Sequence, residues 1–170
     1  MLPKLTLVLG GARSGKSRHA EGLVAAAPPP WHYVATAQAF DAEMEERIAL
    51  HRERRGTGWR TTDAPLALPQ AIRDLGGGEA PILVDCLTLW VTNLLMAERD
   101  VRAAGADLAG AIAQARAPVV LVSNEVGLGI VPDNALARRF RDEAGHLHQM
   151  LAARADRVLF MVAGLPMAVK

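Results

Sequence analysis

The feature that most constrains the fold is a glycine-rich segment near the start of the sequence. It reads Gly10-Gly11-Ala12-Arg13-Ser14-Gly15-Lys16-Ser17 and fits the pattern G-x-x-x-x-G-K-[ST] at every fixed position. An apolar, strand-like run, Leu5-Leu9, precedes it, and a helix-like stretch follows. A phosphate-binding loop (P-loop) requires this strand–loop–helix context. An accidental glycine turn before a helix is therefore the much weaker interpretation.

The residue types explain what such a loop binds. Glycine lets the backbone adopt turn conformations that a Cβ atom would block, so that the loop N–H groups can point inward at polyphosphate oxygens. The N-terminus of the following helix adds its positive dipole at the same place. We expect Lys16 to contact the β- and γ-phosphates as a catalytic group and the Ser17 hydroxyl to ligand Mg²⁺. All eight residues from Gly10 to Ser17 are expected to bind nucleotide.

Strand-like and helix-like stretches alternate along the rest of the sequence. The expected strands are Leu5-Leu9, Trp31-Thr36, Trp59-Thr62, Pro81-Cys86, Pro118-Ser123 and Arg157-Val162, with Leu165-Lys170 as a further edge strand. The expected helices are Ser17-Ala27, Asp41-Arg55, Leu66-Leu75, Leu87-Arg102, Ala106-Ala115 and Asn134-Ala155. This alternation predicts βαβ units and a mostly parallel sheet with helices on both faces. We expect one α/β domain over residues 1–170, P-loop NTPase-like and RecA-like.

Ligands in such folds bind beyond the carboxyl ends of the strands. Four segments should therefore meet: the P-loop, Ala35-Thr36-Ala37, Asp85-Cys86 and Ser123-Asn124-Glu125. Asp85 ends an apolar strand, as does the Walker B aspartate that holds Mg²⁺. A second role for Asp85, as the base toward a substrate hydroxyl, stays open. Ser123-Asn124-Glu125 is either a polar edge of the site or a simple turn.

A histidine lies on one stripe of the charged helix expected over Asp41-Arg55. Met44, Ile48, His51 and Arg55 recur at i, i+4, i+7 and i+11. A histidine in this setting is more often structural, but the neighbouring Arg52, Arg54 and Arg55 favour phosphate binding. The same cations disfavour protonation and leave a neutral, nucleophilic imidazole. On the chemistry alone, a structural and a covalent role for His51 are about equally supported.

The composition excludes several classes of protein. The chain has 19 basic and 18 acidic residues, a net charge of +1, which gives no reason to expect a nucleic-acid or membrane partner. No apolar stretch reaches the length of a membrane span, and the N-terminal apolar run lacks the layout of a signal peptide. The single cysteine, Cys86, cannot form an internal disulfide and is expected to be a small buried residue. We expect a cytoplasmic protein.

The basic segment near the end of the sequence has two interpretations. Arg138, Arg139, Arg141 and Asp142 fall early in a long expected helix. They either form surface ion pairs, which contribute little stability, or contact an anionic substrate.

Taken together, these motifs resemble the bifunctional adenosylcobinamide kinase / adenosylcobinamide-phosphate guanylyltransferase family of cobalamin synthesis. The matching segments run nearly from end to end. They are the P-loop, Ala35-Thr36-Ala37, Arg47-Ile48 with His51, Arg55, Trp59, Thr61 and Pro65, Asp85-Cys86-Leu87-Thr88-Leu89-Trp90, Asn93-Leu94-Leu95, Ser123-Asn124-Glu125-Val126-Gly127, Gly129-Ile130-Val131-Pro132, Phe140-Arg141-Asp142, Gly145 and Ala163-Gly164-Leu165-Pro166. Many families share the P-loop, whereas the His51 segment and the string Asp85 to Trp90 are far more specific.

The resemblance implies two reactions. A nucleoside triphosphate, ATP or GTP, phosphorylates the aminopropanol hydroxyl of adenosylcobinamide in the presence of Mg²⁺. GTP then donates GMP to that phosphate, giving adenosyl-GDP-cobinamide and pyrophosphate. In the family the histidine matching His51 carries GMP covalently.

The resemblance also extends to residues beside His51 and to the assembly. The residues that match Arg52, Glu53, Arg54, Arg55 and Asp63 contact the nucleotide in the family. Asp63 stands where the family has glutamate, one methylene longer. His148 stands where asparagine is most common, which we interpret as a tolerated surface change. Ring-like homo-oligomers, commonly trimers, are implied as well.

Two other functions stay open at the level of the sequence. One is an ordinary P-loop small-molecule kinase in which His51 is structural. The other is a GTP-binding switch that acts by binding partners. The sequence contains no Asn-Lys-x-Asp motif for guanine recognition, and Asn124, which follows a predicted strand, is followed by Glu125 instead of lysine. A stable GMP adduct on His51 would separate the bifunctional enzyme from both.

Overall fold

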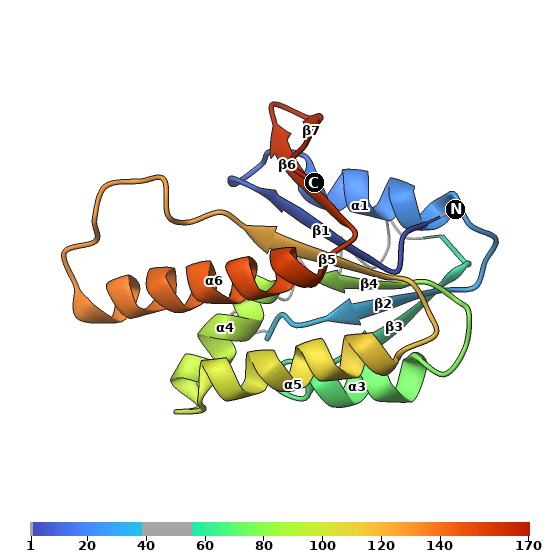
Figure 1. Ribbon diagram of the computed structural model, residues 1–170, viewed down its shortest axis with the longest axis horizontal. Coiled ribbons are helices and arrows are strands. Elements are labelled where there is room, and N and C mark those ends of the chain that lie inside the picture. Colours follow the sequence, from blue (N-terminus) through green and yellow to red (C-terminus); the bar gives the residue numbers. More distant parts are fainter. Residues whose placement is uncertain (1, 39–55) are drawn as a thin grey trace.

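The computed structural model of the protein describes residues 2–38 and 56–170 (Figure 1). The strands are β1 Leu5–Gly10, β2 Trp31–Ala35, β3 Trp59–Asp63, β4 Ile82–Asp85, β5 Val119–Asn124, β6 Arg157–Val162 and β7 Leu165–Ala168. The helices are α1 Lys16–Ala25, α3 Leu68–Leu75, α4 Leu87–Met96, α5 Val101–Gln114 and α6 Ala135–Arg154. The helix predicted over Asp41-Arg55 lies outside the described residues.

The strands form one seven-stranded sheet in the order β3-β2-β4-β5-β1-β6-β7. All neighbouring strands pair in parallel except β6 and β7, which form an antiparallel pair at the edge. The P-loop strand β1 therefore has β5 on one side and β6 on the other. Strand β4, which ends at Asp85, lies on the far side of β5 from β1. This strand order is that of a RecA-like fold. The predicted mostly parallel sheet and the predicted edge strand are both confirmed.

Helices cover both faces of this sheet, as predicted. In Figure 1, α3, α4, α5 and α6 lie on one side of the strands and α1 lies on the other. Successive residues of a strand point to opposite faces, and β1 shows this directly. Leu7 packs in the core under α3–α6, whereas Val8 packs in the smaller core with α1 residues Ala20 and Val24. Both faces of the central strands are thus removed from water, which explains their continuous apolar sequences.

One pair of predicted helix boundaries is wrong. The sequence pattern predicted helices over Leu87-Arg102 and Ala106-Ala115, but α4 ends at Met96 and α5 begins at Val101. Glu98 adopts a left-handed φ of 53° in the intervening turn. The Asp100 side chain then caps α5 by accepting hydrogen bonds from the N–H groups of Arg102 and Ala103, at 2.9 and 3.0 Å. The turn residues Glu98, Arg99 and Asp100 are charged, as residues on an exposed helix face also are, so the pattern did not mark the break.

Within the described ranges, no helix combines the length and apolar character needed to cross a bilayer.

Candidate active site

The P-loop folds as a cradle whose lysine is buried. Lys16 is only 8% exposed, and its Nζ donates a hydrogen bond to the Gly11 carbonyl oxygen at 2.9 Å. Burial lowers the pKa of Lys16, and electrostatic interactions with Cys86 and then Asp85 act in the opposite direction. Burial also raises the pKa of the Cys86 thiol, which keeps that thiol protonated. Asp85 is thus near enough to Lys16 to interact with it electrostatically.

Two glycines of the loop are required by close contacts. A Cβ atom on Gly10 would lie 2.5 Å from Ser14 Oγ and 3.0 Å from Met161 Cβ. Gly15 has a φ of 90°, and a Cβ atom there would lie 3.2 Å from the Cα atom of Gly164. The Gly164 N–H donates to the Ser14 carbonyl oxygen at 3.0 Å. The turn between β6 and β7 thus packs directly against the P-loop.

A second cluster ties the end of β2 to the end of β4. The buried Thr36 hydroxyl donates to the Cys86 carbonyl at 2.7 Å and accepts from the Cys86 N–H at 3.0 Å. Asn93 of α4 donates to the Thr36 carbonyl at 2.7 Å. These bonds hold Asp85, the last residue of β4, in a half-buried position at the carboxyl edge of the sheet.

The segment after β5 completes this edge. Asn124 pairs in register with Gly10, and its Nδ2 donates to Thr88 Oγ1 at 3.1 Å. The Glu125 N–H donates to the Gly10 carbonyl at 2.9 Å, while its carboxylate accepts from the N–H groups of Gly127 and Leu128 at 2.7 and 3.1 Å. The segment is therefore both a turn and part of the site edge. The four predicted segments do meet, and their chemical roles stay predictions.

One predicted residue lies at this edge of the sheet but away from the P-loop. Asp63 ends β3 and pairs in register with Ala35, so β2, β4 and β5 separate it from the P-loop strand. Predicted site residues His51, Arg52, Glu53, Arg54 and Arg55 lie outside the described residues.

The interpretation of His148 as a surface residue is wrong. His148 is half-buried, and its Nε2 lies 2.7 Å from the Oγ of fully buried Ser123, at the end of β5. Burial lowers its pKa, and Glu125 acts in the opposite direction. A sequence signal did exist, because His148 shares a stripe with buried Ala144, Leu147 and Leu151 at helical spacing.

The basic segment of α6 is largely structural. Arg138 donates hydrogen bonds to the carbonyl oxygens of Pro132 and Asp133, both at 2.9 Å. These bonds connect the first turn of α6 to the loop that precedes it. Arg141 and Asp142 form an ion pair at 3.0 Å. These contacts favour the surface interpretation of that segment.

The expected Mg²⁺ ligands have suitable chemistry. Ser17 and Asp85 offer a hydroxyl and a carboxylate oxygen, and oxygen donors are what Mg²⁺ prefers. Within residues 2–38 and 56–170, no group of three or more His, Cys, Asp or Glu side chains is arranged to hold a metal ion.

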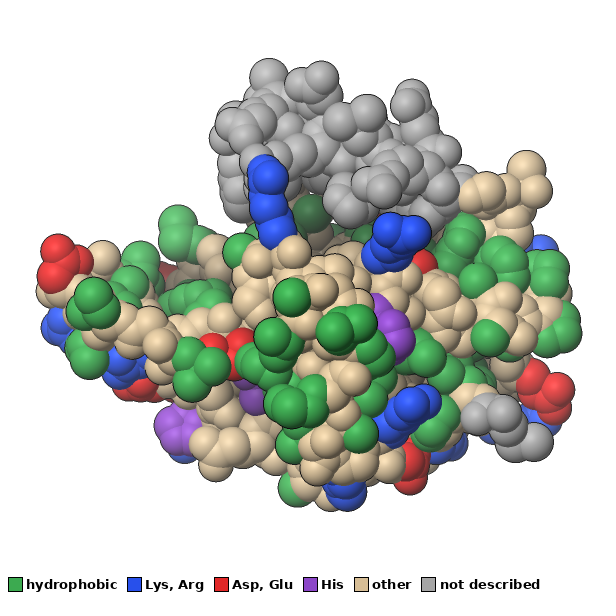
Figure 2. Space-filling model, turned by 90° about the horizontal axis from the view of Figure 1, so that it is seen from above, with side chains coloured by type: hydrophobic (Ala, Val, Ile, Leu, Met, Phe, Trp, Pro, Cys, Tyr) green, Lys and Arg blue, Asp and Glu red, His purple; other side chains and the backbone are tan. Residues whose placement is uncertain are grey.

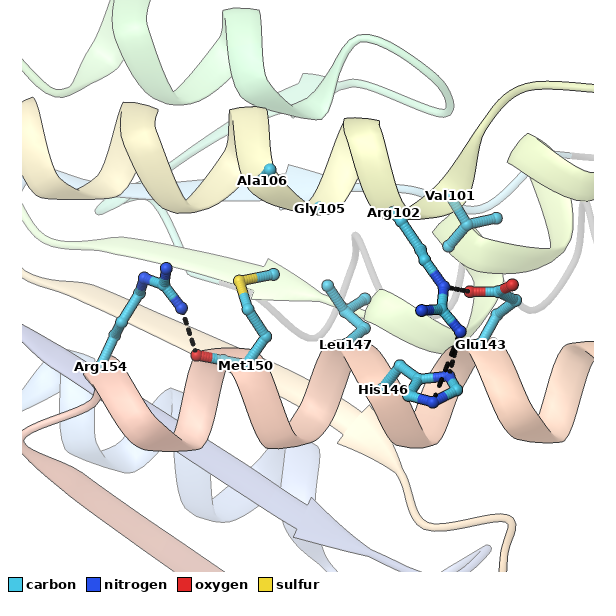
Figure 3. Close-up of a pocket in the computed structure, with 9 residues that line it drawn as sticks. All are labelled: Val101, Arg102, Gly105, Ala106, Glu143, His146, Leu147, Met150 and Arg154. Carbon is cyan, nitrogen blue, oxygen red and sulfur yellow. Dashed lines mark hydrogen bonds and ion pairs between the residues drawn. The ribbon is translucent and has the colours of Figure 1, made fainter.

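Several hollows lie on the surface of the described residues, and three of them bear on the site. A cleft of about 740 Å³ separates Gly11–Ser14 of the P-loop from the 125–129 loop and the end of β6. A second, of about 420 Å³, runs from Gly15 along α1. A third, of about 290 Å³, lies between α5 and α6, where Arg102 contacts Glu143 at 3.4 Å and the His146 ring at 3.0 Å (Figure 3). Of the predicted site residues that the structure describes, none lines this third hollow.

Fold and site together define a P-loop nucleotide-binding protein of the RecA-like type. Comparison with solved structures supports that fold. The flagellar accessory protein FlaH from Methanocaldococcus jannaschii aligns with a TM-score of 0.55 at 14% identity, over 100% of this chain and 80% of FlaH. A type III secretion ATPase of pathogenic bacteria aligns with a TM-score of 0.51 at 11% identity, over 98% of this chain and 57% of the other.

Sequence comparison narrows the class to one family. The model of the family described as cobinamide kinase / cobinamide phosphate guanyltransferase matches residues 6–169, and the chain belongs to this family. The bifunctional adenosylcobalamin biosynthesis protein CobP of Pseudomonas aeruginosa is 52% identical over 166 residues, 96% of each chain. The corresponding CobU of Salmonella typhimurium is 45% identical over 182 residues, covering 98% of this chain and 99% of CobU. The chain is therefore a bifunctional transferase, a kinase and a guanylyltransferase.

Proposed function

We propose that this enzyme phosphorylates adenosylcobinamide with ATP or GTP and then transfers GMP from GTP to the new phosphate, giving adenosyl-GDP-cobinamide and pyrophosphate. The observation that carries the proposal is the family match over residues 6–169, on a chain with an intact P-loop cradle. Nucleotide substrates and a single buried cysteine support action in the cytoplasm.

In the kinase step, the P-loop binds and orients the triphosphate. Lys16 exchanges its hydrogen bond to the Gly11 carbonyl for the β- and γ-phosphates and offsets the charge that develops there. Ser17 and Asp85 would hold Mg²⁺, which neutralises phosphate charge when bound. Asp85 is alternatively the base that accepts the proton of the substrate hydroxyl. The position of Asp85 at the end of β4 and its electrostatic interaction with Lys16 support either role.

In the guanylyl step, we infer a covalent intermediate on His51. The neutral imidazole attacks the α-phosphorus of GTP, a P–N bond forms, and pyrophosphate leaves. An oxygen of cobinamide phosphate then attacks the same phosphorus, and the P–N bond breaks to release His51. Arg52, Arg54 and Arg55 would stabilise the charge on the phosphate, with Glu53 and Asp63 as further nucleotide contacts. The support for these roles is the sequence pattern and the family resemblance.

The test uses GTP labelled in the α-phosphate, followed by quenching in base. We expect protein-bound label in the wild type that is lost in acid, because a phosphoramidate is labile in acid. His51→Ala should lose the label yet retain the kinase step, while His146→Ala, a change at an exposed histidine of α6, should label normally. Equal labelling of the His51→Ala variant, or a label that survives acid, would contradict the proposal. If the wild type forms no adduct, the alternative of a P-loop small-molecule kinase without a guanylyl-histidine intermediate is favoured.

We also propose that the chain forms a homo-oligomer, a trimer by resemblance. Large apolar side chains are exposed on the 126–132 loop, where Ile130 is 98% exposed, and along the β7 edge, where Leu165 and Met167 are 72% and 53% exposed. Figure 2 shows apolar side chains gathered in the middle of the face that carries β6 and β7. Exposed apolar patches of this kind favour contact with another protein surface. Light scattering should give a multiple of the 18.1 kDa chain mass, reduced by Ile130→Asp or Met167→Asp if these surfaces are buried in the oligomer.

A further inference from the structure

The end of β5 lies between two parts of the proposed kinase site. In the sheet, β5 separates β1, which leads into the P-loop, from β4, which ends at Asp85. Asn124 pairs in register with Gly10, and the Glu125 N–H donates to the Gly10 carbonyl oxygen at 2.9 Å. The last residues of β5 therefore form the floor between the P-loop and Asp85, and their position decides where the P-loop begins.

Ser123 places a hydroxyl on the buried face of this strand end. Side chains alternate between the two faces of a strand, and Val119 and Leu121 pack in the core under α3–α6. Ser123 continues that face and is fully buried. Burying a hydroxyl without a hydrogen bond is costly. Among the described residues, the hydrogen-bond partner of its Oγ is His148 Nε2, at 2.7 Å.

His148 is presented by a firmly packed part of α6. Leu147 and Leu151, its neighbours on the inner side of the helix, are both buried in the same core. A side chain on a packed helix is placed more precisely than one on a loop. The imidazole also interacts electrostatically with Glu125. His148 thus connects α6 to the 123–125 segment both by a hydrogen bond and by charge.

We propose that His148 is a positioning residue for the kinase step: through its hydrogen bond to Ser123 it fixes the backbone of residues 123–125 and, through that backbone, the start of the P-loop at Gly10. It acts through Ser123 and contacts no substrate. The proposal rests on the proposed function, because its effect is measured as phosphoryl transfer to adenosylcobinamide. Small displacements of a site lower the rate steeply, so loss of this bond should lower kcat.

The binding of the nucleotide should change much less. The phosphate cradle is shaped by its own hydrogen bonds, which reach the carbonyl oxygens of Gly11 and Ser14 and do not involve residues 123–125. The KM for the nucleoside triphosphate should therefore stay within about threefold of the wild type when the bond between His148 and Ser123 is lost. A purely structural role would instead lower the melting temperature and leave kcat and KM of the folded enzyme unchanged.

The experiment measures kcat, KM and the melting temperature of the full chain, with adenosylcobinamide as the phosphoryl acceptor. His148→Leu removes the hydrogen bond and should lower kcat by about tenfold. His148→Gln brings an amide group close to the place of Nε2 and should restore kcat to within about twofold of the wild type. Ser123→Ala removes the same bond from the other side and should match His148→Leu. If His148→Leu is too unstable to assay, Ser123→Ala decides the question.

The double variant separates positioning from stability. In His148→Leu the Ser123 hydroxyl is left buried without a partner, and adding Ser123→Ala removes that cost. The double variant should therefore regain melting temperature over His148→Leu. Its kcat should stay about as low as that of either single variant, because the two residues act through one bond.

Two controls make the result specific. Thr6→Val removes a hydroxyl from β1 that is also fully buried and that has no hydrogen-bond partner among the described residues, and it should leave kcat unchanged. His146→Leu changes an exposed histidine of the same helix and should leave kcat unchanged too.

The other outcomes separate the two proposals. Wild-type protein that does not phosphorylate adenosylcobinamide would overturn the proposed function itself. Active wild type with His148→Leu and Ser123→Ala both within about twofold in kcat would overturn the role of His148. Losses in kcat that multiply in the double variant, or a kcat that recovers there together with the melting temperature, would overturn it as well.

Discussion

At the scale of single residues, Asp85 permits a test that separates its two proposed roles. Asp85→Asn keeps the shape of the side chain and removes the charge. If Asp85 holds Mg²⁺, the Mg²⁺ concentration for half-maximal kinase rate should rise by about tenfold or more, while the melting temperature shifts by only a few degrees.

The rate is measured across a Mg²⁺ titration, beside a thermal melt. Asp74→Asn, at an exposed position on α3, is the matched control and should behave as the wild type. A rate that falls equally at every Mg²⁺ concentration would contradict the metal role and assign Asp85 to proton transfer.

The residue scale also shows how far sequence reasoning reaches. The burial of Cys86 and the meeting of Asp85 with the P-loop were predicted, because a residue at the end of an apolar parallel strand has few other places to lie. The contact of His148 with Ser123 was not, because it joins α6 to a strand 25 residues earlier in the sequence. A helical stripe indicates burial, but it does not identify the partner across the interface.

At the scale of elements, the β6–β7 turn orients the P-loop backbone. The Gly164 N–H binds the Ser14 carbonyl. Because a trans peptide is planar, with C=O and N–H on opposite sides, the Gly15 N–H is held facing away from Gly164. The turn itself depends on positive φ angles, 50° at Ala163 and 82° at Gly164.

Substitutions at Gly164 should follow backbone preference rather than size. We expect Gly164→Val to weaken tripolyphosphate binding by several-fold, since a β-branched residue resists positive φ, and Gly164→Asn to stay near the wild type. Glu98→Val introduces the same kind of strain at a φ of 53° in the turn between α4 and α5, and it should lower stability without changing affinity. Equal affinities for all four proteins would show that the turn does not position the loop.

Element prediction succeeded where periodicity was clear. Each of the seven strands appears within about two residues of its expected place, because the central parallel strands are short apolar runs with clear boundaries. The α4–α5 break was missed because Glu98, Arg99 and Asp100 are residues that an exposed helix face also carries, so the capping aspartate did not stand out. Strand order depends on pairing between distant segments, which no local pattern encodes.

At the scale of the whole molecule, three histidines make stability depend on acidity. Burial is the main cause that lowers the pKa values of His19, His32 and His148, with Arg157 and Arg60 adding to it for the first two and Glu125 opposing it for His148. Near and below pH 6.5 the unfolded chain therefore binds more protons at these histidines than the folded chain does. The free energy of unfolding should fall as pH drops below about 6.5, by at most about 1.4 kcal/mol per pH unit for each histidine.

Urea unfolding at pH 7.5, 6.5 and 5.5 measures this slope above the range in which most carboxylates titrate. His148→Asn should make the slope shallower, and His146→Asn, at an exposed position on the same helix, should leave it unchanged. A stability that does not change between pH 7.5 and 5.5 would contradict the assignment of neutral buried imidazoles.

The place of β1 in the sheet has a consequence for synthesis of the protein. β1 and the P-loop leave the ribosome early, but both strands that pair with β1 come more than a hundred residues later. Until β5 and then β6 emerge, an apolar strand with two bare hydrogen-bonding edges is exposed on the nascent chain, a hazard for aggregation and a target for chaperones. β1 is thus translated before the six other strands of the sheet but gains its two neighbours only after β5 and β6 have been made, and the P-loop that follows β1 waits for them too.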